Sequence, residues 1–179
     1  MSGEVSESAA LLNIEGADVH MANILATLSD TVWVSNKTFV VIDEEIYSAK
    51  EGTEGTEDPW GGPDGEWDWF ATSGNGLLVT TEFGDQVVDV RFELWDGPPF
   101  SSEPWTKEWE GEIALFSGTI CLADWVEHPP ARLIFDLGRR ETVWGVHAYM
   151  WRLREPMTND RHGTSYDLEF YLVQFWEQR

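Results

Sequence analysis

Residues 87–95 read VVDVRFELW and carry the clearest strand pattern in the chain. Apolar and charged side chains alternate, which places Val88, Val90, Phe92 and Leu94 on one face and Asp89, Arg91 and Glu93 on the other. The run ends at Asp96-Gly97-Pro98-Pro99, which cannot continue a central strand. This stretch predicts a strand with one face on a core and the other toward solvent.

Further β-like runs surround this segment, separated by turns rich in Gly, Pro, Asp and Asn. We expect strands within residues 31–42, 66–72, 77–83, 112–122, 131–137, 142–153 and 166–176. Residues 35–37 are a possible hairpin turn, and residues 73–76 (SGNG) are a strong turn signal. The last two runs are apolar on both faces, as buried central strands are. The pattern predicts an all-β protein, an antiparallel β-sandwich of about seven or eight strands.

A chain of 179 residues suits one domain. We expect residues 1–30 to be a short irregular or helical N-terminal segment, partly flexible, and residues 31–179 to form a single sandwich domain. Residues 17–28 fit a strand or a short helix about equally well.

The formal net charge is −22, and it is unevenly distributed. Residues 1–68 carry a net −13, residues 69–129 a net −9, and residues 130–179 a net of zero. Such a charge argues against direct binding to nucleic acid or to an anionic membrane, since both need clustered Lys and Arg. Neither a membrane-spanning run nor a signal-peptide pattern is visible, so we expect a cytoplasmic protein.

The sequence offers no recognisable catalytic or metal-binding motif. Its four histidines have no metal-ligand spacing, and Cys121 is most simply a buried structural thiol. No Gly-x-Ser-x-Gly elbow or phosphate-binding loop is present. We therefore expect no enzyme activity, no cofactor and no metal, with a loose calcium site at residues 64–68 as a minor alternative.

The informative stretch is the acidic loop of residues 43–69, in which tryptophans are interleaved with carboxylates. Aromatic residues anchor interfaces, and carboxylates steer and orient a basic partner. We expect the partner-binding residues to be Asp43, Glu44, Glu45, Glu51, Glu54, Glu57, Asp58, Trp60, Asp64, Glu66, Trp67 and Asp68. The hypothesis is an acidic inhibitor or immunity-type protein that presents carboxylates in place of phosphates to a basic nuclease or other nucleic-acid enzyme.

Two alternatives belong to other classes. A β-sandwich with loop tryptophans can be a carbohydrate-binding module, in which sugars stack on the aromatic faces. A structural component of a phage or secretion particle would form large assemblies, whereas the inhibitor hypothesis predicts a monomer or small homo-oligomer. Trp105 and Trp109 recur beside Glu103, Glu108 and Glu110 in a second Pro-containing connection, where core and surface positions are equally compatible with the sequence.

The order of strands in the C-terminal half also carries a resemblance. The runs at residues 87–90 (VVDV), 144–149 (WGVHAY) and 171–176 (YLVQFW) resemble small bacterial β-sandwich proteins related to the competence-associated nuclease inhibitors. That resemblance implies inhibition of a nuclease by an acidic protein, and it transfers no inhibitory residue to a position in this sequence.

Overall fold

The computed structural model describes residues 22–34, 36–48, 69–73, 75–124, 133–153 and 165–178. These residues form ten strands and one short helix. The elements are β1 (Ile24–Val34), β2 (Thr38–Asp43), α1 (Glu44–Ser48), β3 (Phe70–Ser73), β4 (Gly76–Thr80), β5 (Gln86–Trp95), β6 (Lys107–Leu115), β7 (Thr119–Asp124), β8 (Phe135–Asp136), β9 (Thr142–Arg152) and β10 (Ser165–Glu177). The prediction of an all-β fold is confirmed.

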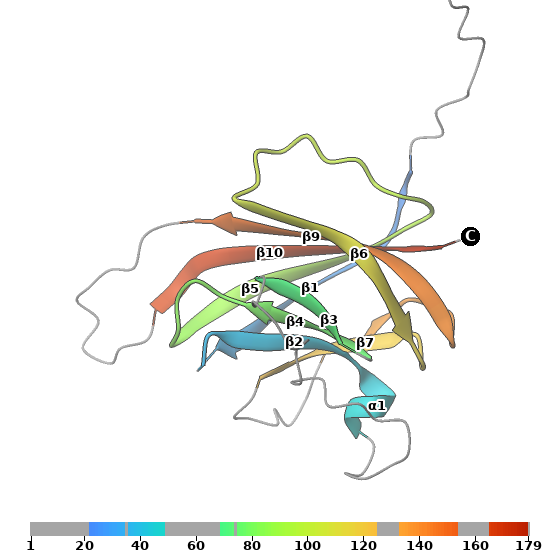
Figure 1. The fold of residues 1–179 in the computed structure, drawn as a ribbon, viewed down its shortest axis with the longest axis horizontal. Helices are drawn as coiled ribbons and strands as arrows, with labels where there is room; N and C mark the ends of the chain where they lie inside the picture. The colour runs from blue at the N-terminus through green and yellow to red at the C-terminus, as the bar shows by residue number, and fades with distance from the viewer. Residues whose placement is uncertain are drawn as a thin grey trace, which may run out of the picture.

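The strands form two five-stranded sheets that face each other (Figure 1). Sheet A has the order β1-β5-β10-β9-β6, and sheet B has the order β3-β4-β2-β7-β8. All pairings are antiparallel except that of β10 with β5. A parallel neighbour needs a long crossover, and here the chain between β5 and β10 supplies β6 to β9.

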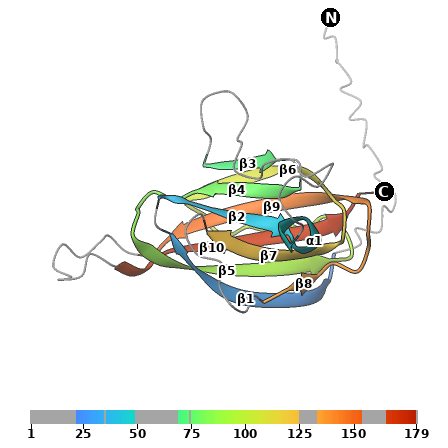
Figure 2. The same cartoon turned by 90° about the horizontal axis from the view of Figure 1, so that it is seen from below.

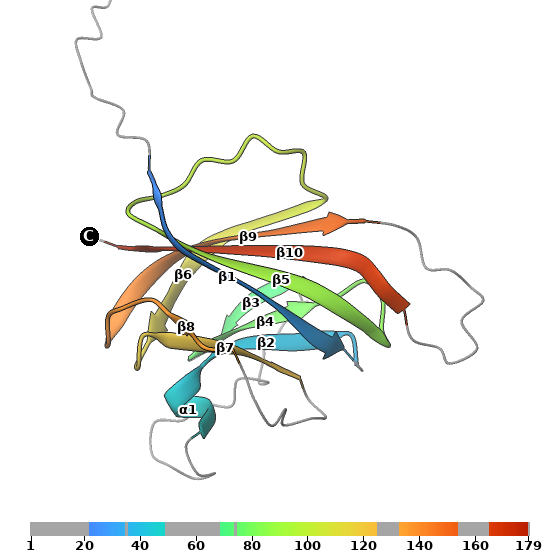
Figure 3. The same ribbon diagram turned by 180° about the vertical axis from the view of Figure 1, so that it is seen from behind.

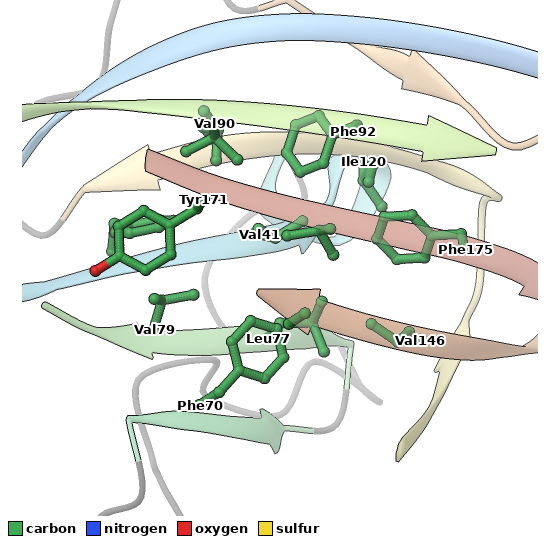
Figure 4. Packing of buried hydrophobic residues seen from close by; sticks show 14 of the residues in the cluster. Val41, Phe70, Leu77, Val79, Val90, Phe92, Ile120, Val146, Tyr171 and Phe175 are labelled. Carbon is green, nitrogen blue, oxygen red and sulfur yellow. The ribbon is translucent and has the colours of Figure 1, made fainter. Parts of the chain in front are cut away.

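The core lies between the sheets and is built from the alternating apolar positions of both. In β5 the inward residues are Val88, Val90 and Phe92, as the alternation predicted, and each is 1% exposed or less. Figure 4 shows Val90 and Phe92, with Tyr171 and Phe175 of β10, facing residues such as Val41, Leu77 and Val79 of sheet B. The sandwich is thus held by apolar burial from both sheets.

Some sequence expectations about individual strands were wrong. Strand β1 begins at Ile24, so residues 24–30 belong to sheet A and not to the N-terminal segment. The connection at residues 35–37 does not close a hairpin, because β1 pairs with β5 in sheet A while β2 pairs with β4 and β7 in sheet B. The expected run 112–122 is divided between β6 and β7, which lie in different sheets.

That division occurs at the turn containing Gly118. Its φ is +76°, and a Cβ there would lie 2.0 Å from the carbonyl oxygen of Arg139. Only glycine tolerates both the conformation and the close approach. The turn predicted at 73–76, in contrast, agrees with the antiparallel pairing of β3 and β4, in which Ser73 lies opposite Gly76.

Two features outside the core bear on function. Helix α1 follows β2 directly and lies on the outer side of sheet B (Figure 3). On the opposite side of the molecule, the connection between β5 and β6 passes over the outer face of sheet A, above β9 and β10 (Figure 1). At one side of the sandwich β3 lies beside β6 (Figure 2), so β6 stands at the junction of the sheets.

Candidate protein-binding surface

Most of the acidic loop that the sequence singled out falls outside the described residues. This is true of Glu51, Glu54, Glu57, Asp58, Trp60, Asp64, Glu66, Trp67 and Asp68, and of the alternative calcium site at 64–68. The structure describes the first three carboxylates, Asp43, Glu44 and Glu45, at the end of β2 and the start of α1.

Asp43 has an internal role. Its side chain is fully buried, and its carboxylate accepts hydrogen bonds from the backbone N–H and the hydroxyl of Ser117, at 2.7 and 2.6 Å. The Oδ1 atom also accepts from the backbone N–H groups of Glu45 and Ile46, at 3.1 and 3.4 Å, which caps the start of α1. A carboxylate occupied in this way cannot face a partner, so Asp43 is removed from the expected contact residues.

Glu44 and Glu45 are accessible, and both have partners within the chain. Glu44 accepts a hydrogen bond from the Ser48 hydroxyl at 2.7 Å. Glu45 is held in a two-point ion pair by Arg140, at 2.5 and 2.7 Å, and the hydrogen bond from Arg140 lowers the pKa of Glu45. The Arg140 guanidinium also lies 5.1 Å from the centre of the Phe116 ring. The charge of Glu45 is therefore already balanced on the surface.

Other Lys and Arg side chains in the described ranges also form ion pairs with carboxylates. Ion pairs join Arg91 to Glu93, Lys107 and Arg152 to Glu82, Arg139 to Glu177, and Arg140 to Glu45. With so few basic residues in the chain, these pairs leave many carboxylates without a counter-charge.

Three carboxylates without a Lys or Arg partner in the described ranges follow one another on the outward face of strand β6. Its outward positions are Glu108, Glu110 and Glu112, all exposed, while Ile113 and Leu115 point into the core. In the described part of the chain no Lys or Arg pairs with these three carboxylates, and Glu110 approaches only His147, at 3.4 Å. Successive outward side chains on a strand lie about 6.7 Å apart. Strand β6 therefore presents a row of single negative charges.

Residues 96–106 connect β5 to β6 and form what we call the β5–β6 flap. One end is fixed by Asp96, whose carboxylate accepts hydrogen bonds from the backbone and side-chain nitrogens of Asn23, at 2.7 and 3.1 Å. The other end is fixed by Trp105, whose ring packs on Tyr149, Trp151 and Phe170 at centroid distances of 5.0, 5.6 and 6.5 Å. Trp105 thus anchors the flap to sheet A, whereas Trp109 packs against the main core.

The anchored flap exposes one large apolar side chain. Phe100 is 91% exposed, although its neighbour in the flap, Pro99, is buried. The indole Nε1 of Trp105 donates a hydrogen bond to the Ser101 hydroxyl at 2.8 Å, which braces the chain next to Phe100. An exposed phenylalanine on a braced loop is available to pack against a partner protein, since aromatic side chains often anchor interfaces.

A pocket of about 350 Å³ lies between the flap and the outer face of sheet A. Its walls include Phe100, Glu108, Glu110, His147 and Tyr149. The register places Glu108 opposite Tyr149 and Glu110 opposite His147, and the Tyr149 hydroxyl lies 3.3 Å from His147 Nδ1. Burial raises the pKa of Tyr149, and the charges of Glu108 and Glu110 raise it further. The pocket therefore combines aromatic walls with a negative potential.

The described residues contain no group of three His, Cys, Asp or Glu side chains arranged to hold a metal ion. Cys121 is buried, as expected. None of the helices in the described ranges has the length and hydropathy to span a membrane.

The sequence contained the alternating pattern of the β6 row, but the predicted strand began too late to include all of it. Residues 107–115 read KEWEGEIAL, in which glutamates alternate with Trp109, Gly111 and Ile113. Starting the strand at Glu112 left Glu108 and Glu110 in a loop, where their common direction could not be inferred. The pocket had no such signal, since it depends on the pairing of β6 with β9.

No protein-family model and no curated protein matches the sequence. Among solved structures, the chain is similar to ComJ from Bacillus subtilis, described as an inhibitor of the DNA-degrading activity of NucA. The match has a TM-score of 0.53 and 12% identity, and covers 88% of this chain and 99% of ComJ. A structure described as Crocagin biosynthetic gene J matches with a TM-score of 0.49 and 11% identity, covering 88% of this chain and 99% of that one. The resemblance to competence-associated nuclease inhibitors seen in the strand order is confirmed as a weak resemblance of fold.

Proposed function

We propose that this chain is an acidic, non-catalytic inhibitor that binds a basic nuclease or other nucleic-acid enzyme. The observation that carries the proposal is the row Glu108, Glu110 and Glu112, which is exposed and has no Lys or Arg counter-charge in the described ranges. Its first two members line a pocket together with the exposed Phe100. A row of single negative charges on an extended chain imitates the charge pattern of a nucleic-acid strand. An enzyme groove that attracts phosphates will attract such a row.

The fold shared with ComJ supports this reading, because ComJ is described as inhibiting the DNA-degrading activity of a nuclease. The acidic loop beyond α1 remains part of the proposed surface. The proposed contact residues are thus the β6 row and Phe100, together with the carboxylates and tryptophans of residues 51–68.

The test is a nuclease assay with the full chain as the inhibitor. Each nuclease encoded in the genome that carries this sequence is incubated with plasmid DNA, with and without the chain, at low and high salt. We expect at least one nuclease to be inhibited at a near-stoichiometric ratio, with weaker inhibition at high salt because exposed charges are screened.

A pair of variants distinguishes the effect of the β6 row on association from the effect of the total charge of the protein. Glu110→Gln and Glu141→Gln each remove one negative charge, but Glu141 lies in the turn before β9 and outside the β6 row. We expect E110Q to slow association about two- to fivefold and E141Q to leave it unchanged. The proposal is wrong if no nuclease is inhibited, or if the chain itself degrades DNA. A change in tryptophan fluorescence on adding oligosaccharide would favour the carbohydrate-binding alternative.

A further inference from the structure

The pocket beneath the β5–β6 flap has a composition that selects its ligand. Two carboxylates on one strand, Glu108 and Glu110, lie beside the ring of Tyr149, and Phe100 stands at the pocket wall. The volume of about 350 Å³ lies near the lower end of the range of ligand pockets, about 300–1,000 Å³. It suits one long side chain with some water rather than a large cofactor.

Charge excludes anionic occupants. Within the described ranges, neither Glu108 nor Glu110 is paired with a Lys or Arg, and Glu110 lies 3.4 Å from His147. Burial raises the pKa of Tyr149 most, and the negative charges of Glu108 and Glu110 raise it further, since ionising that hydroxyl would add a third negative charge beside them. A cation is the complementary occupant.

Resting on the proposed function, we propose that this pocket binds one arginine side chain of the basic partner protein, with Phe100 packing against the partner surface beside it. A guanidinium is planar, donates from several N–H groups to carboxylates, and stacks on aromatic rings. A lysine ammonium satisfies the carboxylates but makes a poorer contact with aromatic walls. The exposure of Phe100 points to a protein occupant, because a small ligand would leave most of that ring in water.

The β6 row provides a matched control within one strand. Glu112 is exposed and faces outward like Glu108 and Glu110, but it lies opposite Gly145 and does not line the pocket. Substituting it changes the net charge by the same amount as E110Q. Comparing E110Q with E112Q therefore distinguishes a contact inside the pocket from long-range electrostatic attraction.

The experiment titrates the isotope-labelled full chain with three probes and follows backbone NMR shifts at Phe100, Ser101, Glu110 and His147. The probes are N-acetyl-arginine methylamide, its lysine equivalent and its neutral citrulline equivalent. We expect the arginine probe to shift these signals with a Kd of about 1 mM or weaker, the lysine probe to bind more weakly, and the citrulline probe to have no effect.

The variants then test the assignment. E110Q should weaken binding of the arginine probe, and E108Q/E110Q should weaken it at least about fivefold. F100A should weaken it less than the double variant, and E112Q, which removes one charge as E110Q does, should leave it unchanged. Equal binding of citrulline, an equal effect of E112Q, or no shift at the pocket would overturn the proposal. Lysine binding as strong as arginine would overturn the choice of a guanidinium. No nuclease enters this assay, so a failure of the pocket is distinguishable from a failure of the inhibitor function.

Discussion

The carboxylate of Asp43 accepts two hydrogen bonds from Ser117, from its backbone N–H at 2.7 Å and from its hydroxyl at 2.6 Å. This contact joins the end of β2 to the turn between β6 and β7, across 74 residues of sequence. The acidic stretch therefore begins with a structural carboxylate, and exposed acidity starts only at the following residues.

Asp43→Ala should destabilise the protein by about 2–4 kcal/mol, because it leaves buried donors of Ser117 and α1 without an acceptor. Glu44→Ala is the control, since the Glu44 carboxylate accepts an exposed hydrogen bond from Ser48 on the same helix. It should cost less than about 0.5 kcal/mol. Urea unfolding measures both values, and equal midpoints for the two variants would contradict the internal role of Asp43.

The sequence predicted those features that depend on local alternation. Strands β5, β9 and β10 were placed correctly because each is a long run whose side-chain period shows within the run itself. Sheet membership is not local, so the short connection after β1 looked like a hairpin although it crosses between sheets. The division of β6 from β7 at Gly118 was missed for the same reason, because it depends on the approach of Arg139 from a distant turn.

For the candidate site, the sequence predicted carboxylates interleaved with tryptophans, and that prediction still has to be tested by experiment. Counting charges could not distinguish the buried Asp43 or the paired Glu45 from free carboxylates. The β6 row and the pocket emerge only when β6 is paired with β9 beneath the flap.

Gly145 in β9 lies opposite Trp176 of β10, and the indole covers the space where a side chain would be. A Cβ at Gly145 would come within 2.2 Å of Trp176 Cε2, and Trp176 is only 5% exposed and packs on His147. We expect G145A to lower stability by about 1–3 kcal/mol. G111A also introduces a clash, 2.3 Å from Trp109, but that ring is half-buried and can move. Thermal unfolding should show the smaller loss for G111A, and the reverse order would refute this account.

Glu169 is a buried carboxylate with a pH dependence that can be predicted in sign. Burial raises its pKa above the usual 4.5, and hydrogen bonds from Tyr171, the Glu82 backbone and Gln86 offset this only in part. A raised pKa in the folded state means that folding favours the protonated form. Its contribution to stability is therefore complete below pH 4.5 and is lost as the pH rises through the folded-state pKa.

Glu169→Gln removes this titration. The stability of the wild type relative to E169Q should be greatest in acid and should decline as the pH rises. Urea unfolding of both proteins across the pH series gives the difference directly, and the general repulsion among carboxylates largely cancels in it. A difference that stays constant or grows with pH would show that burial does not control Glu169.

Two aromatic residues of the β5–β6 flap are expected to have different roles, one in stability and the other in binding. Trp105 packs on Tyr149 and Trp151 and donates a hydrogen bond to Ser101, whereas Phe100 is 91% exposed. Trp105→Ala should therefore lower stability by about 2 kcal/mol and weaken arginine-probe binding, because the flap loses its anchor. Phe100→Ala should leave stability within about 0.5 kcal/mol of the wild type, because an exposed ring contributes little burial.

The same Phe100→Ala variant should nevertheless lose affinity for the inhibited nuclease, by roughly tenfold or more if the ring is a central anchor. Urea unfolding and titration of the nuclease assay, performed on one preparation of each variant, provide the two readouts. If F100A unfolded as early as W105A, Phe100 would belong to the packing of the flap. If F100A inhibited as well as the wild type, Phe100 would not be a contact residue, and the β6 row and the loop of residues 51–68 would remain as the proposed contact surface.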